Sequence, residues 1–395
     1  MKGEREFKGT VVHLVPAMEQ GGVERVVCNL NRAAVRAGWR SVVISRGGRL
    51  VGQIVADGGE HVALDLKSKN PLTYLTRAWK LRKAIREIAG RDAKILVCAH
   101  SRVPAWLYVG ARLKFPWVTY AHGANSVSRY SAVMTRGDRV VVPSKFLAGY
   151  LIENYAGAGG EDAGDGTPAD KTLSSATPLR ERIRVIYPAV DFERFDPAKV
   201  DAAAVAALRR EWGVRDGERV VMSIGRITAL KGFDNVIRAF AGQTPESEVE
   251  KWKGGKVEKL GGDKLVIVGG VDKGKEPLFE SLKKLADELG VADRVVFAGA
   301  RSDIPECLMV ADEVVSGNVT KPESFGLSVA EALAMGKPVR LMRNFGGAGE
   351  ILEECGRRIA REQNGDAERR EAIRSLCDSD IMWQQTEKVY EELLK

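Results

Sequence analysis

The chain has 395 residues, 44% hydrophobic and 29% charged, which is an ordinary composition for a globular protein of two or three domains. No apolar run approaches the roughly 20 residues that a membrane span needs, and the charged segment Met1–Thr10 lacks the apolar core of a secretory signal. The five cysteines are scattered without a CxxC pair, which argues against a zinc site or a disulfide framework. We therefore expect a cytoplasmic protein that binds no metal.

The net charge of +8 is unevenly distributed. Met1–Phe195 holds 30 Lys and Arg against 18 Asp and Glu, whereas the remainder holds 31 against 35. A basic N-terminal half indicates an anionic partner, such as a phosphorylated acceptor, an acidic membrane surface or a nucleic acid. An Arg-rich solvated surface is the alternative. We expect no nucleic-acid partner, because the half has no recognition motif and no interleaved aromatic stripe.

Short β-branched runs alternate with stretches of helical periodicity, which predicts βαβ units and mainly parallel sheets. In the N-terminal half the expected strands are Thr10–Val15, Ser41–Ser45, Lys94–Cys98, Trp117–Tyr120 and Arg139–Val142. The expected helices there include Gly22–Ala37, Thr73–Ala89 and Ser144–Glu153. Gly157–Leu179 is poor in large apolar residues and is expected to be an exposed, mobile insertion. Arg182–Asp196 is expected to form a last strand and a turn-rich connector.

A second series of alternating strands and helices is expected to begin at Arg219. Its expected strands are Val220–Ile224, Leu265–Val268, Arg294–Phe297, Glu313–Val315 and Pro338–Leu341. Its expected helices include Gly232–Ala241, Pro277–Leu289 and Ser324–Met335. Lys251–Asp263 is expected to be an exposed loop, and Ile381–Lys395 a closing helix anchored by Trp383, Val389, Tyr390 and Leu393.

The fold class that follows is α/β, with two Rossmann-like domains that face a cleft between them. We expect an N-terminal domain at 1–195 and a C-terminal domain at 196–380, with the helix at 381–395 packing back toward the N-terminal domain. Ligands of open parallel sheets bind outside the carboxyl ends of the strands. The strand-to-helix turns are therefore the segments in which to look for functional residues.

Glu323 and Glu331 are the first candidate pair. If a loop leads from Glu323 into a helix, Glu331 lies about two turns along that helix, and both carboxylates can face one ligand. Carboxylates suit vicinal hydroxyls, while the backbone N–H groups of Phe325, Gly326 and Leu327 suit an anion at a helix N-terminus. A ligand with both hydroxyls and phosphate fits this segment. Taken alone, the two glutamates are ordinary helix-start and surface acids.

Arg226 and Lys231 follow the strand Val220–Ile224 in a turn with glycine at each end, and two cations in such a turn suit a diphosphate. Gly21-Gly22 follows the first strand and precedes a helix, so its backbone can approach a phosphate or sugar closely. It is not a dinucleotide-binding fingerprint. His122 lies just past another strand end, where a structural role and a functional role remain equally open.

Together these segments resemble the retaining glycosyltransferases of the GT-B fold, specifically glycosyltransferase family 4. The resemblance runs from Gly21 to about Glu350. It is carried by Gly21-Gly22-Val23-Glu24, Tyr120-Ala121-His122-Gly123, Gly225-Arg226 with Lys231-Gly232, Pro322-Glu323-Ser324-Phe325-Gly326-Leu327 with Glu331-Ala332-Leu333-Ala334-Met335-Gly336, and Gly346-Gly347-Ala348-Gly349-Glu350.

The resemblance implies a donor site for a nucleoside-diphosphate sugar. It implies that Glu323 contacts the sugar hydroxyls, that Glu331 binds the ribose, and that Arg226 and Lys231 neutralise the diphosphate. Further donor contacts are implied for Gly21 and Gly22, for Ser324, and for the backbone of Phe325, Gly326 and Leu327. His122 is placed by the resemblance near the 6-position of the donor sugar and the reaction centre. The catalytic residues implied are His122, Arg226, Lys231 and Glu323.

The implied activity is retaining transfer of a hexose-type sugar, UDP- or GDP-linked, to a hydroxyl of a glycan or lipid-linked acceptor. The family resemblance implies metal-independent chemistry without a cofactor, in cell-surface polysaccharide or lipopolysaccharide biosynthesis. A sugar-nucleotide epimerase of the same fold and an inactive GT-B binding or scaffold protein are the alternatives. Asp378-Ser379-Asp380 resembles the metal motif of GT-A transferases, but we interpret it as a helix cap.

Three segments depart from the family pattern: the basic strand Pro338–Arg343, the charged stretch after Glu350, and the insertion Gly157–Leu179. A basic amphipathic helix at Leu75–Lys94 can rest on an anionic membrane, which predicts peripheral contact with the inner face of the plasma membrane. Its basic side chains are Arg77, Lys80, Arg82, Lys83, Arg86, Arg91 and Lys94. A sheet-covering helix with a solvated face is the alternative.

Overall fold

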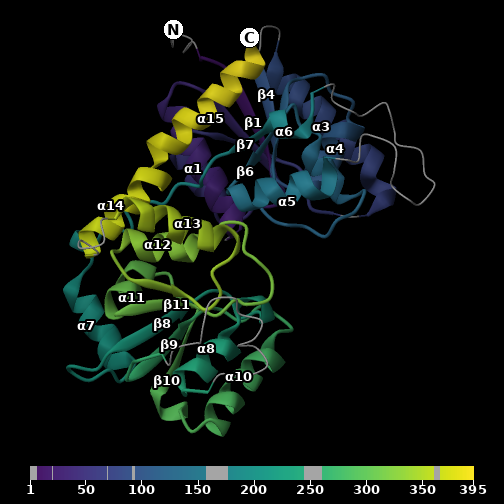
Figure 1. The fold of residues 1–395 in the computed structure, drawn as a ribbon. Helices are drawn as coiled ribbons and strands as arrows, with labels where there is room; N and C mark the ends of the chain where they lie inside the picture. Colours follow the sequence, from purple (N-terminus) through teal and green to yellow (C-terminus); the bar gives the residue numbers. More distant parts are fainter. Residues whose placement is uncertain are drawn as a thin grey trace. The chain divides into compact units, whose positions relative to one another are not determined.

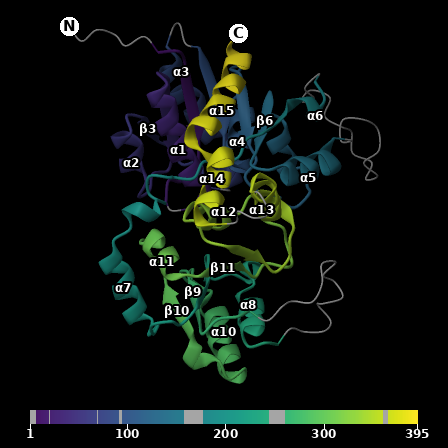
Figure 2. The same cartoon turned by 60° about the vertical axis from the view of Figure 1, so that its left-hand side comes forward.

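The structure is a computed structural model that describes residues 7–19, 21–68, 70–90, 94–156, 177–243, 260–359 and 365–395. The chain divides into two compact units. Unit 1 comprises Met1–Ala189 with Ser379–Lys395, and unit 2 comprises Val190–Asp378. Each unit is built on an open parallel sheet with helices along its faces (Figures 1 and 2).

The sheet of unit 1 has seven strands in the order β3-β2-β1-β4-β5-β6-β7, all parallel to their neighbours. In that order their bounds are Glu60–Ala63, Arg40–Ser45, Thr10–Leu14, Ile95–Ala99, Trp117–Tyr120, Arg139–Val142 and Ile183–Val185. The predicted strands are confirmed to within one residue at their ends. The sequence analysis missed β3, because this edge strand has four residues and only two of them are half-buried.

The helices of unit 1 lie on the two faces of this sheet. They are α1 (Gly22–Arg36), α2 (Val51–Ala56), α3 (Tyr74–Ala89), α4 (Arg102–Gly110), α5 (Lys145–Tyr155), α6 (Leu179–Arg182) and α15 (Ser379–Leu394). One core cluster joins apolar residues of α3, α4 and α5 to the sheet. A second joins α1 and α15 to the opposite face, and α15 runs beside α1 in both views (Figures 1 and 2).

The last helix, α15, is anchored to unit 1 by aromatic and polar contacts. Tyr390 is fully buried, and its ring meets that of Trp39 edge-on with centroids 5.7 Å apart. The indole Nε1 of Trp39 donates a 2.8 Å hydrogen bond to Glu387. The predicted anchors Trp383 and Val389 are also buried, and Leu393 is partly buried.

The sheet of unit 2 has five parallel strands in the order β10-β9-β8-β11-β12. In that order their bounds are Val295–Gly299, Lys264–Val268, Val220–Ile224, Glu313–Ser316 and Val339–Leu341. The helices of the unit are α7 (Ala202–Glu211), α8 (Phe233–Phe240), α10 (Glu276–Glu288), α11 (Ile304–Val310), α12 (Leu327–Ala334), α13 (Gly346–Arg358) and α14 (Asp366–Cys377). The strands predicted for this half are again confirmed to within two residues.

Three boundaries differ from the expectation. The change of unit falls between Ala189 and Val190 rather than after Phe195. The physical reason is that the guanidinium of Arg370, on α14, bonds the backbone carbonyls of Phe192 and Phe195 and so holds this segment in unit 2. The two segments that were expected to be exposed, Gly157–Leu179 and Lys251–Asp263, lie mostly outside the described residues. Within their described parts, Leu179 and Leu260 are buried core residues.

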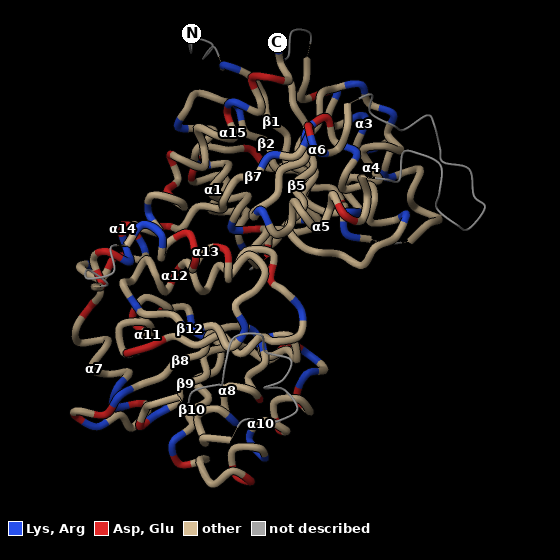
Figure 3. Tube along the Cα trace, viewed as in Figure 1, with Lys and Arg blue, Asp and Glu red and all other residues tan. Residues whose placement is uncertain are grey.

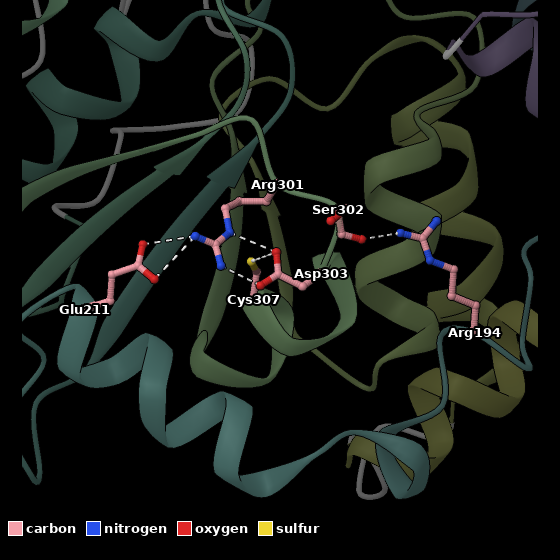
Figure 4. Close-up of polar contacts among 6 residues, drawn as sticks. All are labelled: Arg194, Glu211, Arg301, Ser302, Asp303 and Cys307. Atoms are coloured by element: carbon pink, nitrogen blue, oxygen red, sulfur yellow. Dashed lines mark hydrogen bonds and ion pairs between the residues drawn. The ribbon is translucent and has the colours of Figure 1, made fainter. Parts of the chain in front are cut away.

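A polar network around Arg301 joins the loop after β10 to neighbouring elements of unit 2 (Figure 4). Its guanidinium donates to both carboxylate oxygens of Asp303, at 2.8 and 2.5 Å, and to Glu211 at the end of α7 at 3.0 Å. The hydrogen bond from Arg301 lowers the pKa of Asp303. Arg194 donates to the carbonyl of the neighbouring Ser302 at 2.8 Å, so the segment that enters unit 2 is fixed to the same loop.

Candidate donor site and histidine row

In unit 2 the turns that follow β8 and β11 meet at backbone contact. Gly232 has a φ of 63°, and a Cβ on it would lie 2.0 Å from the carbonyl oxygen of Gly317, just past β11. Only glycine permits both this conformation and this approach. The two turns come from adjacent strands, whose carboxyl ends lie at the same edge of the sheet. The region predicted to hold functional residues is therefore assembled by backbone packing.

This packing brings Lys231 and Glu323 together. Nζ of Lys231, at the end of the short helix Ala229–Lys231, lies 2.6 Å from Oε1 of Glu323 in the loop after β11. Their side chains are 26% and 15% exposed, so the pair is partly shielded from water but still reachable. The structure thus places a cation and a carboxylate, predicted separately from the sequence as site residues, in direct contact.

The loop Pro322–Gly326 is held by the N-termini of two helices, α12 and α13. Gly326 precedes α12 with a φ of 92°, and a Cβ on it would come within 2.8 Å of Ala348 in α13. The backbone N–H of Gly347 donates a 2.7 Å hydrogen bond to the carbonyl of Glu323. Helix N-termini attract negative charge through their first-turn N–H groups. This loop is therefore suited to an anion that also carries hydroxyls.

The helix in this segment begins later than predicted, at Leu327 rather than Ser324. The left-handed conformation of Gly326 delays the first helical turn. As a result Glu331 lies about one turn into α12 and not two, and it is half-buried. The ring of Phe325 is buried, 4% exposed, so its backbone rather than its side chain is the part that a ligand can reach. Ser324 is half-buried.

Arg226 is placed just past β8, but its side chain contacts Asp272 rather than the Lys231–Glu323 pair. Its Nη1 lies 3.1 Å from a carboxylate oxygen of Asp272, which follows β9, and its side chain is 75% exposed. The sequence analysis did not single out Asp272. The only signal in the sequence that pointed to Asp272 was its position in the turn after β9, the strand next to β8.

The basic strand that departs from the family pattern has structural partners. Arg340, on β12, bonds the buried Glu313 on the neighbouring β11 at 2.8 Å. Arg343 donates to the carbonyl of Val319 at 2.8 Å and lies over the ring of Phe345. These contacts hold β12 and the loop after it, so the extra positive charge of this strand contributes to packing.

In unit 1 the predicted glycines lie at the start of α1. Gly21 precedes the helix in an extended conformation, and the exposed Gly22 is its first residue. The 15-residue helix carries Glu24 in its first turn. Gly22 therefore presents its backbone at a helix N-terminus, as the sequence indicated, in a unit separate from the Lys231–Glu323 pair.

His122 lies two residues past β5 and belongs to a row of three histidines. Its Nε2 is 3.0 Å from Nδ1 of His100, and Nε2 of His100 is 3.0 Å from Nδ1 of His13. Burial lowers the pKa of His13 to about 3 and that of His122 to about 4, and it lowers the pKa of His100 well below its usual value. All three imidazoles are therefore neutral at pH 7.

The sequence analysis singled out His122 and missed His13 and His100. The signal for them was present, since three of the four histidines in the chain lie in or just beyond β1, β4 and β5. These three strands are neighbours in the sheet. Strand order is not readable from a single sequence, so the row could not be assembled without the structure.

Within the described ranges no three His, Cys, Asp or Glu side chains are grouped so as to hold a metal ion. Asp378, between α14 and α15, is the C-cap of α14, and Asp380 lies in the first turn of α15. The five cysteines are all buried free thiols.

No helix in the described part of the chain is both long enough and apolar enough to cross a membrane.

Comparison with known families matches both halves of the chain. The model described as Glycosyltransferase Family 4 matches residues 20–158, and the model described as Glycosyl transferases group 1 matches residues 205–391. The chain belongs to the family 4 glycosyltransferases. The first match lies within unit 1, whereas the second covers most of unit 2 and continues into α15 of unit 1. The second match contains every residue of the Lys231–Glu323 region.

Curated relatives of this family 4 protein include D-inositol 3-phosphate glycosyltransferases. That of Mycobacterium marinum is 31% identical over 230 residues, which are 58% of this chain and 43% of that protein. That of Mycolicibacterium smegmatis is 35% identical over 173 residues, 43% of this chain and 34% of that protein. The chain thus spans less than half the length of these relatives.

Solved structures match over nearly the whole chain. A glycosyltransferase from Rickettsia africae matches with a TM-score of 0.73 and 22% identity, covering 98% of this chain and 99% of that one. Anabaena HepE in complex with UDP-glucose matches with a TM-score of 0.69 and 20% identity, covering 97% and 100%. These likenesses confirm the predicted fold class, two Rossmann-like α/β domains of GT-B type.

Proposed function

We propose that this protein is a retaining glycosyltransferase that moves a hexose-type sugar from a nucleoside-diphosphate sugar to a hydroxyl acceptor. The observation that carries the proposal is the Lys231–Glu323 ion pair, in which Glu323 lies in a loop that is backed by the N-termini of α12 and α13. Cation, carboxylate and helix N-terminus together suit a ligand with both a diphosphate and hydroxyls. A solved structural relative, HepE, is in complex with UDP-glucose, which supports a nucleotide sugar as the donor.

In this proposal the residues of unit 2 contact different chemical groups of the donor. Lys231 and Arg226 face the diphosphate, Glu323 accepts hydrogen bonds from the sugar hydroxyls, and Glu331 accepts those of the ribose. The backbone N–H groups of Phe325, Gly326 and Leu327, with Ser324, hold the remaining donor oxygens. From unit 1 we assign donor contacts to Gly21 and Gly22 and a place near the reacting sugar to His122.

The catalytic effect that we propose is electrostatic. Breaking the bond between sugar and phosphate places negative charge on the departing diphosphate, and fixed cations stabilise that charge more in the transition state than in the ground state. Lys231 is already held in place by Glu323, so little reorganisation is needed when charge develops. We propose that Arg226 and Lys231 supply the positive charge that a metal ion provides in other transferases, and that the protein needs no cofactor.

The proposed retention of configuration rests on the carboxylates near the site. We assign Glu323 and Glu331 to hydroxyl binding, and we assign neither to covalent attack. Same-face attack, with the leaving phosphate assisting deprotonation of the acceptor, then accounts for retention without a glycosyl-enzyme intermediate.

We further propose a glycan or lipid-linked acceptor, in cell-surface polysaccharide or lipopolysaccharide biosynthesis, and a cytoplasmic protein that contacts the inner membrane face. The contact surface is the exposed side of α3 and the turn before it. Leu72, Leu75 and Trp79 are 88%, 75% and 62% exposed, at the helical spacing of one face. Lys80, Lys83 and Arg86 are exposed on the same helix, whose basic positions are marked in Figure 3.

Two of the predicted basic residues, Arg77 and Lys94, do not belong to this surface. Lys94 lies beyond α3, which ends at Ala89. Arg77 is buried and donates to the carbonyls of Ser68, Asn70 and Thr73, so it holds the preceding turn together. Arg91 lies outside the described residues. The surface that remains combines apolar and basic side chains, which is the pattern of interfacial helices.

Flotation with liposomes tests the membrane contact. Binding should rise with the content of anionic lipid and should fall several-fold in a Leu75→Ser/Trp79→Ser variant. Replacement of the exposed Val55 and Val271, on other surfaces, is the matched control and should leave flotation unchanged. Flotation that is indifferent to anionic lipid would overturn the contact.

The names of the curated relatives favour a second acceptor class, an anionic polyol phosphate. The basic N-terminal half is compatible with either acceptor. Transfer to inositol phosphate in solution, with none to a lipid-linked glycan, would select the second class.

A panel of sugar nucleotides tests the central activity. A transferase should hydrolyse its own donor slowly when no acceptor is present. Interconversion of free sugar nucleotides would indicate the epimerase instead. Binding without either reaction would indicate an inactive scaffold.

A further inference from the structure

The turn Gly225–Gly232 carries both cations of the proposed donor site, and backbone contacts hold it on two sides. On one side, a Cβ on Gly232 would overlap the carbonyl oxygen of Gly317, just past β11. On the other side, a Cβ on Gly269, just past β9, would overlap the carbonyl oxygen of Gly225. The turn is therefore fixed between the turns that follow both neighbours of β8 in the sheet.

Backbone hydrogen bonds continue from β8 to β9 on both sides of Arg226. The N–H group of Gly225 donates to the carbonyl of Val268 at 3.0 Å. The N–H group of Ile227 donates to the carbonyl of Gly270 at 2.9 Å. The backbone of Arg226 is thus fixed beside the turn after β9, and the freedom that remains at this residue is that of its long side chain.

Each cation of the turn is paired with one carboxylate, but the two ion pairs differ in their exposure to water. Lys231 and Glu323, 2.6 Å apart, have side chains that are 26% and 15% exposed. The aliphatic stem of Lys231 also packs on Gly225, where a Cβ would lie 3.0 Å from its Cε. Arg226 and Asp272, 3.1 Å apart, are 75% and 51% exposed. Exposed ion pairs are weak because water solvates both partners, so Lys231 is the fixed cation and Arg226 the exchangeable one.

A diphosphate that binds Arg226 has to compete with Asp272. The forked N–H groups of a guanidinium match carboxylate and phosphate oxygens alike, and a guanidinium that is paired with one of them is less available to the other. A diphosphate carries more negative charge than one carboxylate, so it can displace Asp272. Its net affinity is then reduced by the strength of the Arg226–Asp272 pair that it breaks.

We propose that Asp272 competes with the diphosphate for Arg226 and so limits the affinity of the site for nucleoside diphosphates. The proposal rests on the transferase function proposed above, in which Arg226 faces the diphosphate. Sugar transfer leaves a free nucleoside diphosphate as product, and the return of Arg226 to Asp272 favours its release. Asp272 contacts no donor atom in this scheme, so it is a positioning residue that acts through Arg226.

Calorimetry with UDP, GDP and inorganic pyrophosphate tests the competition at low ionic strength. Asp272→Asn should raise the affinity for the diphosphates that the wild-type protein binds by roughly two- to fivefold, the range expected for an exposed ion pair. The gain should shrink at high salt, which screens exposed charges. Equal affinities in Asp272→Asn and the wild-type protein would overturn the proposal.

Glu288→Gln is the matched control. Glu288 forms an ion pair with Lys284 on α10, its side chain is 57% exposed, and its replacement changes the net charge by the same amount as Asp272→Asn does. Its affinity for the diphosphates should equal that of the wild-type protein. An equal gain in Glu288→Gln would mean that net charge alone sets the affinity, and the specific role of Asp272 would be wrong.

A double-mutant cycle distinguishes competition for Arg226 from direct repulsion between Asp272 and the diphosphate. In an Arg226→Gln background, Asp272→Asn should leave the affinity unchanged, because the carboxylate no longer has a guanidinium to hold. A gain of the same size in that background would show direct repulsion and would overturn the proposed role.

Donor kinetics provide a measurement that separates competition from a structural role. Asp272→Asn should lower the KM for the donor and the inhibition constant of the nucleoside diphosphate by the same factor. If Asp272 only held the turn after β9 in place, its replacement would loosen that turn and raise both constants. A rise in either constant would therefore refute the competition.

The transferase function and the competition at Arg226 can fail separately. If Asp272→Asn binds a diphosphate more tightly than the wild-type protein does, but neither transfers sugar from any donor, the proposed function fails and the competition stands. If the wild-type protein transfers sugar and Asp272→Asn binds diphosphates no more tightly, the competition fails and the transferase function stands.

Discussion

Nζ of Lys231 and Oε1 of Glu323 lie 2.6 Å apart, although 92 positions separate the two residues in the chain. The contact joins the turn after β8 to the loop after β11, two strands that are hydrogen-bonded neighbours. Each residue therefore fixes the other at the carboxyl edge of the sheet. A lysine held in this way can stabilise a leaving diphosphate without first losing the entropy of a free side chain.

Replacing Lys231 should therefore affect turnover far more than folding. Lys231→Ala should lower kcat by on the order of 100-fold, equivalent to about 3 kcal/mol of lost transition-state stabilisation. Lys283→Ala removes an exposed lysine that pairs with Glu280 on α10 and serves as the control. Steady-state kinetics with the natural donor measure both. Wild-type kinetics in Lys231→Ala would refute the diphosphate role.

The two glutamates should have separable effects. Glu331→Ala should weaken UDP or GDP binding about tenfold, because the role proposed for Glu331 is to accept hydrogen bonds from the ribose. Glu323→Ala should leave nucleotide affinity nearly unchanged and should chiefly lower turnover, because its proposed contacts are with the sugar and because the change releases Lys231 from its ion pair. Calorimetry with the diphosphate, beside kinetics with the donor, separates the two. Equal losses of nucleotide affinity would mean that the roles are assigned wrongly.

Gly326 should tolerate no side chain. A Cβ would lie 2.8 Å from Ala348, and φ is 92°, so Gly326→Ala should destabilise the protein by roughly 1–3 kcal/mol and move the N-terminus of α12. Gly356→Ala in α13 is the matched control, because a Cβ there meets no atom within 4 Å. It should stabilise by about 0.5–1 kcal/mol. Chemical denaturation measures both, and equal effects would contradict the packing of α12 on α13.

The Arg301–Asp303 pair should make a small, pH-dependent contribution to stability. The pKa of Asp303 is lowered by its hydrogen bond from Arg301, so the stabilisation is present above the unfolded pKa of about 4 and is lost as pH falls through the folded value. Arg301→Gln should cost at most about 1 kcal/mol at pH 7, because the pair is partly exposed to solvent. Denaturation curves at pH 7 and pH 3 should show this difference shrinking in acid. A difference that grows in acid would be the contrary result.

Sequence pattern was sufficient for most of the fold because both sheets are parallel and buried. Strands such as Val220–Ile224 and Trp117–Tyr120 were predicted at their observed bounds, since short β-branched or aromatic runs favour strands over helices. The edge strand β3 and the core positions of Leu179 and Leu260 escaped prediction. Their burial depends on tertiary neighbours and not on local composition.

The candidate site, too, could be predicted only in part from the sequence. Individual residues such as Lys231 and Glu323 could be predicted from the turns in which they lie. Their direct contact could not, because it depends on strand order and on the close approach of Gly232 to Gly317. The contact of Arg226 with Asp272 and the contacts among His13, His100 and His122 could not be predicted for the same reason. The start of α12 was misplaced because one left-handed glycine displaced it.

Calorimetric titration of the protein with UDP and with GDP is the decisive test of the proposed donor site, because both diphosphates contain every group that the Lys231 and Glu331 assignments require. We expect one binding site per chain for at least one of them, with an affinity that falls about tenfold in Glu331→Ala and is unchanged in Gly356→Ala. If the folded protein binds no nucleoside diphosphate, the proposed donor site is wrong.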